Sequence, residues 1–243
     1  MVLKKYTSPN FNDRKNGVDP SMLVLHYTGM RDAKSALSHL CDPSSQVSAH
    51  YVIEENGDVH QLVADEKRAW HAGVSYWRGE RDINSASIGI EIVNPGHEFG
   101  YREFPEGQML SVIKICRDLM RKYDIPAANV LGHSDVAITR KIDPGHLFPW
   151  RRLAEIGIGL WPDPGGVDRQ SAEDMIVAGE DLKSHFVALG YDPEKSLPEI
   201  FTAFHRHYAP EKFMHYNDAP DKADATTIAQ LLSLVRLSSG VIV

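Results

Sequence analysis

The feature that most limits the fold of this chain is a series of short apolar runs that stop at glycine or proline. The run Ser21–Tyr27 ends at Thr28-Gly29, and the run Ser87–Val93 ends at Asn94-Pro95-Gly96. Runs of this length bounded by turn residues predict strands rather than helices. Because Ser87–Val93 alternates small or polar residues with β-branched ones, we expect it to be a central strand of a sheet.

Other segments extend this pattern of strands and helices. A tight hairpin is predicted where Ser48–Glu54 and Asp58–Val63 flank Asn56-Gly57, a pair that readily adopts the positive φ angles of a two-residue turn. Asn129–His133 predicts another short strand. Residues 32–41 fit a short helix, and apolar residues recurring at helical spacing over residues 105–123 predict a long amphipathic one.

The strongest interruption of the pattern is Trp161–Gly166, which contains two prolines and two glycines. We therefore predict one domain over residues 1–160, a linker at 161–170 and a second domain over 171–243. In the second domain apolar residues recur at helical spacing in three stretches, which predicts a small all-α three-helix module: Leu182/Phe186/Leu189, Ile200/Phe204/Tyr208 and Ile228/Leu231/Leu232/Val235.

Charge and composition argue against several classes of function. A formal net charge of -7 without a Lys/Arg run argues against a duplex nucleic-acid partner. No stretch approaches the roughly 18 apolar residues of a membrane span, and the polar N-terminal segment does not resemble a signal peptide. We expect a cytoplasmic monomer, or a periplasmic or secreted one if a leader has been removed. Cys41 and Cys116 lie outside any C-x-x-C pair and are interpreted as buried small apolar residues.

Three potential metal ligands stand next to glycine or proline near the ends of predicted strands. They are His26 in LHYTG, His133 in LGHSD and Asp143 in RKIDPG. Side chains at strand ends can converge on a rigid scaffold. Two imidazoles and one carboxylate suit Zn²⁺ and leave its fourth tetrahedral position open for water. Each residue alone is a weak signal, because the chain has 12 histidines and no H-E-x-x-H helix.

Longer segments carry a family resemblance. LHYTG, RAWHAGVSYWRG, SIGIEIVN and GHSDVAITRKIDPGHLFPW closely resemble the type 2, AmpD-like zinc N-acetylmuramoyl-L-alanine amidases, over about residues 3–160. The resemblance implies an α/β fold with a mixed, mainly antiparallel central sheet flanked by helices. It implies one Zn²⁺ held by His26, His133 and Asp143. Ile138 and His146 stand where relatives often have proline, a departure that bears on substrate preference and not on catalysis.

The implied reaction is hydrolysis of the amide between the lactyl group of N-acetylmuramic acid and L-alanine of the stem peptide. Zinc lowers the pKa of its bound water towards roughly 7 and polarises the carbonyl. The resemblance assigns the proton transfer to Glu91 and an auxiliary role to Lys141, whose charge can face the oxyanion. Four residues are expected to line the sugar and peptide groove, with a packed loop as the alternative: Trp70, His71, Ala72 and Trp77.

The remaining histidines are not assigned to the chemistry. His50 is expected to be structural, and the others are interpreted as ordinary residues: His39, His60, His97, His205 and His207. The C-terminal module is similar to small helical peptidoglycan-binding domains, which would tether the enzyme to polymer, although a packing appendage is the alternative.

Two other functions compete with the amidase. The same fold occurs in peptidoglycan recognition proteins that bind muropeptides without cutting them; loss of a zinc ligand would favour that function, and none is lost here. A metallopeptidase that cuts between amino acids would use similar zinc chemistry. The sequence leaves open whether the substrate is intact peptidoglycan or 1,6-anhydro-muropeptides.

Overall fold

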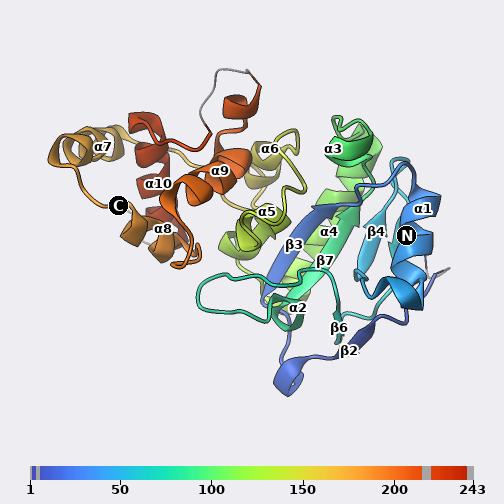
Figure 1. Cartoon of the computed structure of the whole chain (residues 1–243). Coiled ribbons are helices and arrows are strands. Elements are labelled where there is room, and N and C mark those ends of the chain that lie inside the picture. The colour runs from blue at the N-terminus through green and yellow to red at the C-terminus, as the bar shows by residue number, and fades with distance from the viewer. Residues whose placement is uncertain (1, 4–5, 215–219, 240–243) are drawn as a thin grey trace.

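A six-stranded sheet forms the centre of the N-terminal part of the chain, up to about residue 160, in the computed structural model, which describes residues 2–3, 6–214 and 220–239 (Figure 1). Its strand order is β1-β5-β4-β7-β3-β8. The two central strands, β3 (Met22–Tyr27) and β7 (Ser87–Ile92), confirm the predicted strands and pair in parallel along their whole length. In this register His26 lies opposite Glu91, so two of the predicted site residues are neighbours across the sheet.

The sheet is mixed and mostly parallel, so the mainly antiparallel arrangement expected from the sequence is wrong. β7 pairs in parallel with both β3 and β4 (Tyr51–Ile53), and β8 (Val130–Gly132) pairs in parallel with β3. β1 (Val2–Leu3) is parallel to β5 (Val59–Gln61). Within the described part of this sheet only the β4–β5 hairpin is antiparallel. That hairpin is the one pairing with a local sequence signal, whereas parallel partners are brought together by long crossovers.

Helices and a second, two-stranded sheet complete the N-terminal part of the chain. The antiparallel pair joins β2 (Phe11–Asp13) to β6 (Lys67–Ala69). The helices are α1 (Ala33–Cys41), α2 (Ile83–Ala86), α3 (Gly96–Phe99), α4 (Glu106–Tyr123), α5 (His133–Val136) and α6 (Trp150–Ala154), with 3-10 turns at Lys15–Gly17, Pro43–Ser45 and Ala127–Asn129.

The two faces of the sheet have different environments. One face packs against the amphipathic helix α4, whose Met109, Val112 and Cys116 form a core with Leu25 and Ile90. Since successive strand residues point to opposite faces, the residues between these core positions lie on the other face. That second face carries Val24, His26, Gly89 and Glu91. Glu91 therefore lies on the face opposite its neighbours Ile90 and Ile92, which belong to the core formed with α4.

Among the described residues after 165, four helices are found where the sequence predicted three. They are α7 (Gly166–Ala178), α8 (Lys183–Leu189), α9 (Leu197–Tyr208) and α10 (Ala225–Ser238), with a 3-10 turn at Pro210–Phe213. The predicted linker at 161–170 thus contains the start of α7. The pair Gly165-Gly166 does not prevent a helix from starting there, because the Gly165 N–H donates to the Asp168 carboxylate at 2.9 Å and the helix is capped.

The C-terminal helices share a hydrophobic core with the second face of the sheet. In Figure 1, α8, α9 and α10 lie on the α5 side of β3. Val24 and Leu131 from the sheet form one buried cluster with Phe186, Phe204 and Leu231 from the helices. The division into two domains stays a prediction, but buried side chains continue across it. Among the described residues, no helix is both long and apolar enough to cross a bilayer.

Candidate metal centre

Three side chains that are far apart in the sequence meet at one end of the sheet. His26 Nδ1 lies 2.9 Å from His133 Nδ1 and 3.1 Å from Asp143 Oδ2, and His133 Nδ1 lies 3.0 Å from the same carboxylate oxygen. Relative exposures of 1%, 2% and 7% for His26, His133 and Asp143 show that water scarcely reaches them. The set is consistent with a single metal site.

The parallel strands explain this convergence. His26 lies near the carboxyl end of β3, and His133 follows directly after β8, which is hydrogen-bonded to β3. Adjacent parallel strands end at the same edge of a sheet, so the two imidazoles are neighbours. Asp143 arrives on the following loop, which is tied to the start of α5 by a hydrogen bond of 2.9 Å from the Ser134 N–H to the Asp143 carbonyl.

The donor set fits a cation. His133 Nε2 lies 3.1 Å from the Ala72 carbonyl, which only accepts, and farther, 3.4 Å, from the donor Arg140 Nη2. The closer contact places the proton on Nε2, so Nδ1 presents a lone pair to the centre. Although burial raises the pKa of Asp143, the adjacent His133 and His26 hold it well below its usual range, so the carboxylate is ionised. The separations of 2.9 to 3.1 Å are close to the roughly 3.3 Å between tetrahedral zinc ligands.

A carboxylate without a partner lies beside this set. Glu91 Oε2 is buried and has no hydrogen-bond partner in the described part of the chain. Burial raises the pKa of Glu91 well above its usual range, the nearby Asp143 raises it further, and Lys141 lowers it. Unsatisfied buried polar groups are rare in native proteins, and each calls for an explanation such as a missing ion or a catalytic role.

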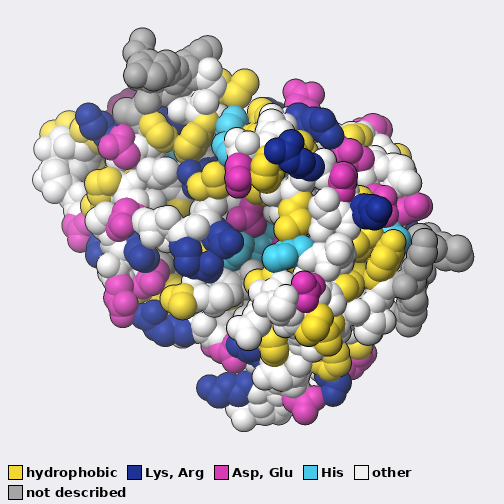
Figure 2. Space-filling model, turned by 45° about the vertical axis from the view of Figure 1, so that its right-hand side comes forward, with side chains coloured by type: hydrophobic (Ala, Val, Ile, Leu, Met, Phe, Trp, Pro, Cys, Tyr) yellow, Lys and Arg dark blue, Asp and Glu magenta, His cyan; other side chains and the backbone are white. Residues whose placement is uncertain are grey.

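These groups line one cavity of about 340 Å³. Figure 2 shows histidine side chains near the middle of this face, next to a group of lysine and arginine side chains. The cavity is lined by the predicted ligands and their neighbours, among them His26, Trp70, His71, Glu91, His133, Lys141 and Asp143. The site is therefore a recess with a polar floor that is open to a small ligand.

Of the four residues predicted to line a substrate groove, two line the cavity and two lie in the hydrophobic core. Trp70 lines the cavity, half-buried, with Nε1 donating to Asn12 Oδ1 at 2.8 Å. His71 also lines it. Ala72 and Trp77 lie instead in the hydrophobic core, with exposures of 0% and 1%. Trp77 packs edge-on against Tyr191, so its burial is explained by the C-terminal segment, which the local sequence pattern does not reveal.

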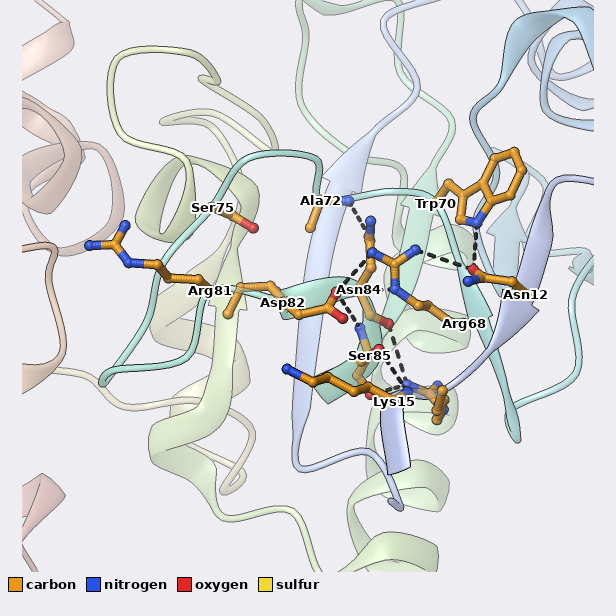
Figure 3. A network of polar contacts seen from close by, with 12 residues as sticks. Asn12, Lys15, Arg68, Trp70, Ala72, Ser75, Arg81, Asp82, Asn84 and Ser85 are labelled. Atoms are coloured by element: carbon orange, nitrogen blue, oxygen red, sulfur yellow. Dashed lines mark hydrogen bonds and ion pairs between the residues drawn. The ribbon is translucent and has the colours of Figure 1, made fainter. Parts of the chain in front are cut away.

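Other important residues have no signal in the sequence. Asn84 Oδ1 accepts from the N–H groups of His71 at 3.0 Å and Ala72 at 2.7 Å, and so holds the wall of the cavity. Figure 3 shows Asn84 reaching Ala72, with Trp70 held by Asn12 nearby. Asn84 is 7% exposed, and its hydrogen bond reaches a residue 12 positions away. No sequence motif marks an asparagine of this kind.

Two buried histidines outside the metal centre, His50 and His207, have partners within the protein. His50 is buried and accepts the Gly89 N–H at 3.0 Å, which confirms its predicted structural role. His207, interpreted as an ordinary residue, is buried on α9 and pairs with Asp135 of α5 at 2.7 Å. Tyr191 OH also reaches Asp135, at 3.3 Å. The helix that begins at the metal-centre histidine is thus tied to the C-terminal helices.

Comparison with known proteins agrees with this geometry. The family model described as N-acetylmuramoyl-L-alanine amidase matches residues 16–146, which include all three predicted ligands. The curated N-acetylmuramoyl-L-alanine amidase AmiD of Escherichia coli strain K12 is 35% identical over 229 residues, covering 86% of this chain and 82% of AmiD. The 1,6-anhydro-N-acetylmuramyl-L-alanine amidase AmpD of Haemophilus influenzae is 33% identical over 167 residues, covering 61% of this chain and 89% of AmpD.

Solved structures are similar over nearly the whole chain. The crystal structure of AMPDH3 from Pseudomonas aeruginosa in complex with an anhydromuramic pentapeptide superposes with a TM-score of 0.79 at 32% identity, covering 91% of this chain and 93% of that one. The complex of E. coli AmiD with its substrate anhydro-N-acetylmuramic acid-L-Ala-D-gamma-Glu-L-Lys gives a TM-score of 0.73 at 32% identity, covering 97% and 92%. The similarity therefore includes the C-terminal helices.

Proposed function

The chain belongs to the N-acetylmuramoyl-L-alanine amidase family, and from this premise we propose that it is a zinc amidase acting on anhydromuramyl peptides. The bond cleaved is the amide between the lactyl group of the muramic acid and L-alanine of the stem peptide. The observation that carries the proposal is the complete His26, His133, Asp143 set beside Glu91, whose buried Oε2 has no hydrogen-bond partner among the described residues. The ligands bound to two solved relatives are anhydromuramyl peptides, which supports this substrate class.

The predicted ligands, Glu91 and Lys141 each have a distinct role in the proposed reaction. His26, His133 and Asp143 hold one zinc ion, which when bound supplies Lewis-acid polarisation of the scissile carbonyl and acidifies water. Glu91 takes a proton from the attacking water and gives it to the departing amine, because it lies opposite His26 on the same face of the sheet and its Oε2 has no partner in the described part of the chain. Lys141, on the cavity wall, places its positive charge where the oxyanion develops.

The shape of the cavity also supports substrate roles. Trp70 offers an indole face on the wall, where it can pack against the apolar face of the sugar. All of these groups come from one chain, so a monomer suffices for the reaction. A receptor that only binds would leave the substrate intact, and the complete ligand set favours hydrolysis over that alternative.

A second role is proposed for the C-terminal helices, which is binding to polymeric peptidoglycan. It is supported by an open groove of about 510 Å³ on these helices, well apart from the metal centre. The groove has an apolar lining that includes Met175, Ile176, Leu197, Pro198 and Phe201. Because the same helices also pack on the sheet, they would bring the catalytic cavity to the polymer in a fixed orientation.

Identification of the products tests both proposals. The protein is incubated with anhydro-N-acetylmuramic acid-L-Ala-D-γ-Glu-L-Lys and the products are identified by mass spectrometry. We expect anhydro-N-acetylmuramic acid and the intact tripeptide, and none with the variant His26→Ala. Release of single amino acids would indicate a peptidase, and unchanged substrate that stays bound would indicate a receptor. Sedimentation with insoluble peptidoglycan sacculi should carry the wild-type protein down and leave Ile176→Asp in solution.

A further inference from the structure

His71 lies directly behind the metal centre and contacts two buried groups. Its Nδ1 is 3.1 Å from Nε2 of His26, and its Nε2 is 3.2 Å from Oγ of Ser87. Its side chain is nearly buried, with 9% exposure, while Ser87 is fully buried at 0%. His71 thus stands between a predicted metal ligand and a serine hydroxyl, and the position of each hydrogen in this chain can be worked out.

The hydroxyl of Ser87 decides the first hydrogen. Its Oγ lies only 2.5 Å from the carbonyl oxygen of Ile83. A carbonyl oxygen carries no hydrogen, so the single hydroxyl hydrogen of Ser87 must point to it. Ser87 can therefore only accept from His71, and the proton of the His71 ring lies on Nε2.

The same reasoning continues to His26. His71 Nδ1 and His26 Nε2 face each other, so one must donate and the other accept. A neutral imidazole carries a single hydrogen, and that of His71 lies on Nε2, so its Nδ1 accepts and His26 Nε2 donates. A metal-binding imidazole is neutral, so His26 carries no second hydrogen. The lone pair of His26 is left on Nδ1, which faces His133 and Asp143.

We propose that His71 and Ser87 are positioning residues that fix the tautomer of His26, so that Nδ1 is the nitrogen available to the metal. The inference rests on the metal site of the proposed function but not on its substrate. The tautomer of His133 is fixed in the same way by a different partner, the Ala72 carbonyl. Both imidazoles thus present Nδ1, and their Nε2 atoms are held by the protein, the arrangement by which outer hydrogen bonds orient metal-binding histidines.

The strand beneath His71 is shaped to receive its ring. A Cβ atom at Gly89 in β7 would lie 2.6 Å from both Cδ2 and Nδ1 of His71, closer than side-chain atoms can approach. Glycine in the interior of a strand weakens it, so its presence indicates close approach of another group. Asn84 holds the backbone N–H of His71 at 3.0 Å from the other side. The ring is therefore fixed by contacts that do not involve the metal ligands.

This role differs from the substrate contact that the sequence suggested for His71. Both of its ring nitrogens already have partners inside the protein, so neither is free to bind a sugar or peptide. A substrate-binding residue would affect the affinity for the peptide and leave metal binding unchanged. A positioning residue would do the reverse, and the two roles can be separated by measurement.

The test measures zinc affinity by competition with a chelator, without any substrate. His71→Leu, which removes the acceptor, should raise the zinc dissociation constant about 10- to 100-fold, as loss of such an outer partner typically does. His71→Asn keeps an oxygen near the position of Nδ1 and should recover most of the affinity. Gly89→Ala removes no polar group but displaces the His71 ring, so it should also raise the zinc dissociation constant. His205→Leu removes another buried histidine, far from the centre, and should change stability without changing zinc affinity.

The tautomer itself is read by two-bond ¹H–¹⁵N correlation spectra of the histidine rings in zinc-loaded and metal-free protein. The expected result is a proton on Nε2 of both His26 and His71, and a mixture of His26 tautomers in metal-free Ser87→Ala. A proton on Nδ1 of metal-free His26, or unchanged zinc affinity in both His71→Leu and Gly89→Ala, would overturn the inference. Neither readout requires hydrolysis, so the proposal on His71 can fail while the amidase proposal stands, and the reverse.

Discussion

At the scale of single residues, the most informative feature is the carboxylate of Glu91. It lies on the site face of β7, opposite His26 in register, and its buried Oε2 has no partner among the described residues. The protein maintains an elevated pKa for this group through burial. A group that is poised to hold a proton in a cavity suits general acid–base catalysis rather than a structural role.

Glu91→Gln tests that role. The amide keeps the size and the hydrogen-bonding reach of the side chain but cannot accept a proton, so turnover should fall by about 10² to 10⁴. Zinc content and the affinity for the peptide should stay nearly unchanged, because Glu91 is not among the grouped ligands. Steady-state kinetics and metal analysis measure this, with the exposed Glu103→Gln as the control. Near-normal turnover, or loss of zinc, would show that Glu91 is not the proton carrier.

Sequence and structure agree on the three candidate metal ligands and differ on several of the residues around them. His26, His133 and Asp143 were predicted because each stands in a distinctive segment, and the structure brings them together. Asn84, Ser87 and His207 escaped notice because their partners lie far along the chain. Trp77 was misplaced since an aromatic residue in a motif-rich loop gives no indication of what will cover it.

At the scale of elements, the strands were predictable and their pairing was not. Local hydrophobicity and turn residues located β3, β7, β8 and α4 to within a few residues. Pairing direction in a mostly parallel sheet depends on crossovers such as the one through α4, between β7 and β8, which bring distant strands together. The helix α7 was missed because its glycine-rich start is typical of a linker.

The link between α5 and α9 leads to a second prediction. His207→Leu would leave the buried Asp135 carboxylate without its closest side-chain partner, at 2.7 Å. Although the Gly132 N–H and Tyr191 OH still donate to Asp135, loss of a hydrogen bond to a charged group costs about 1.5 to 3 kcal/mol, so the free energy of unfolding should fall by that amount in urea titrations. Because α5 starts at His133, zinc should also bind more weakly. His185→Leu, on α8, provides the control; equal stability and zinc affinity in both variants would contradict the link.

At the scale of the whole molecule, the catalytic half and the C-terminal helices form one packed body. The sequence suggested a detachable module beyond the prolines and glycines at 161–166, because such residues are typical of linkers. Side chains of both halves nevertheless share a buried cluster, in which Val24 and Trp77 meet Phe186 and Phe204. A pattern within one segment cannot reveal packing between two segments. Only the structure shows that the C-terminal helices pack on the face of the sheet that carries His26 and Glu91.

The central claim is that one zinc ion, held by His26, His133 and Asp143, makes this chain an amidase. The most direct measurement is to strip the protein with a chelator, remove the chelator, and add zinc in small steps while following hydrolysis of the anhydromuramyl tripeptide. We predict no turnover in the stripped protein, a linear rise with added zinc and a plateau at one zinc per chain. Full turnover in the metal-free protein, or a plateau unrelated to one equivalent, would contradict the account.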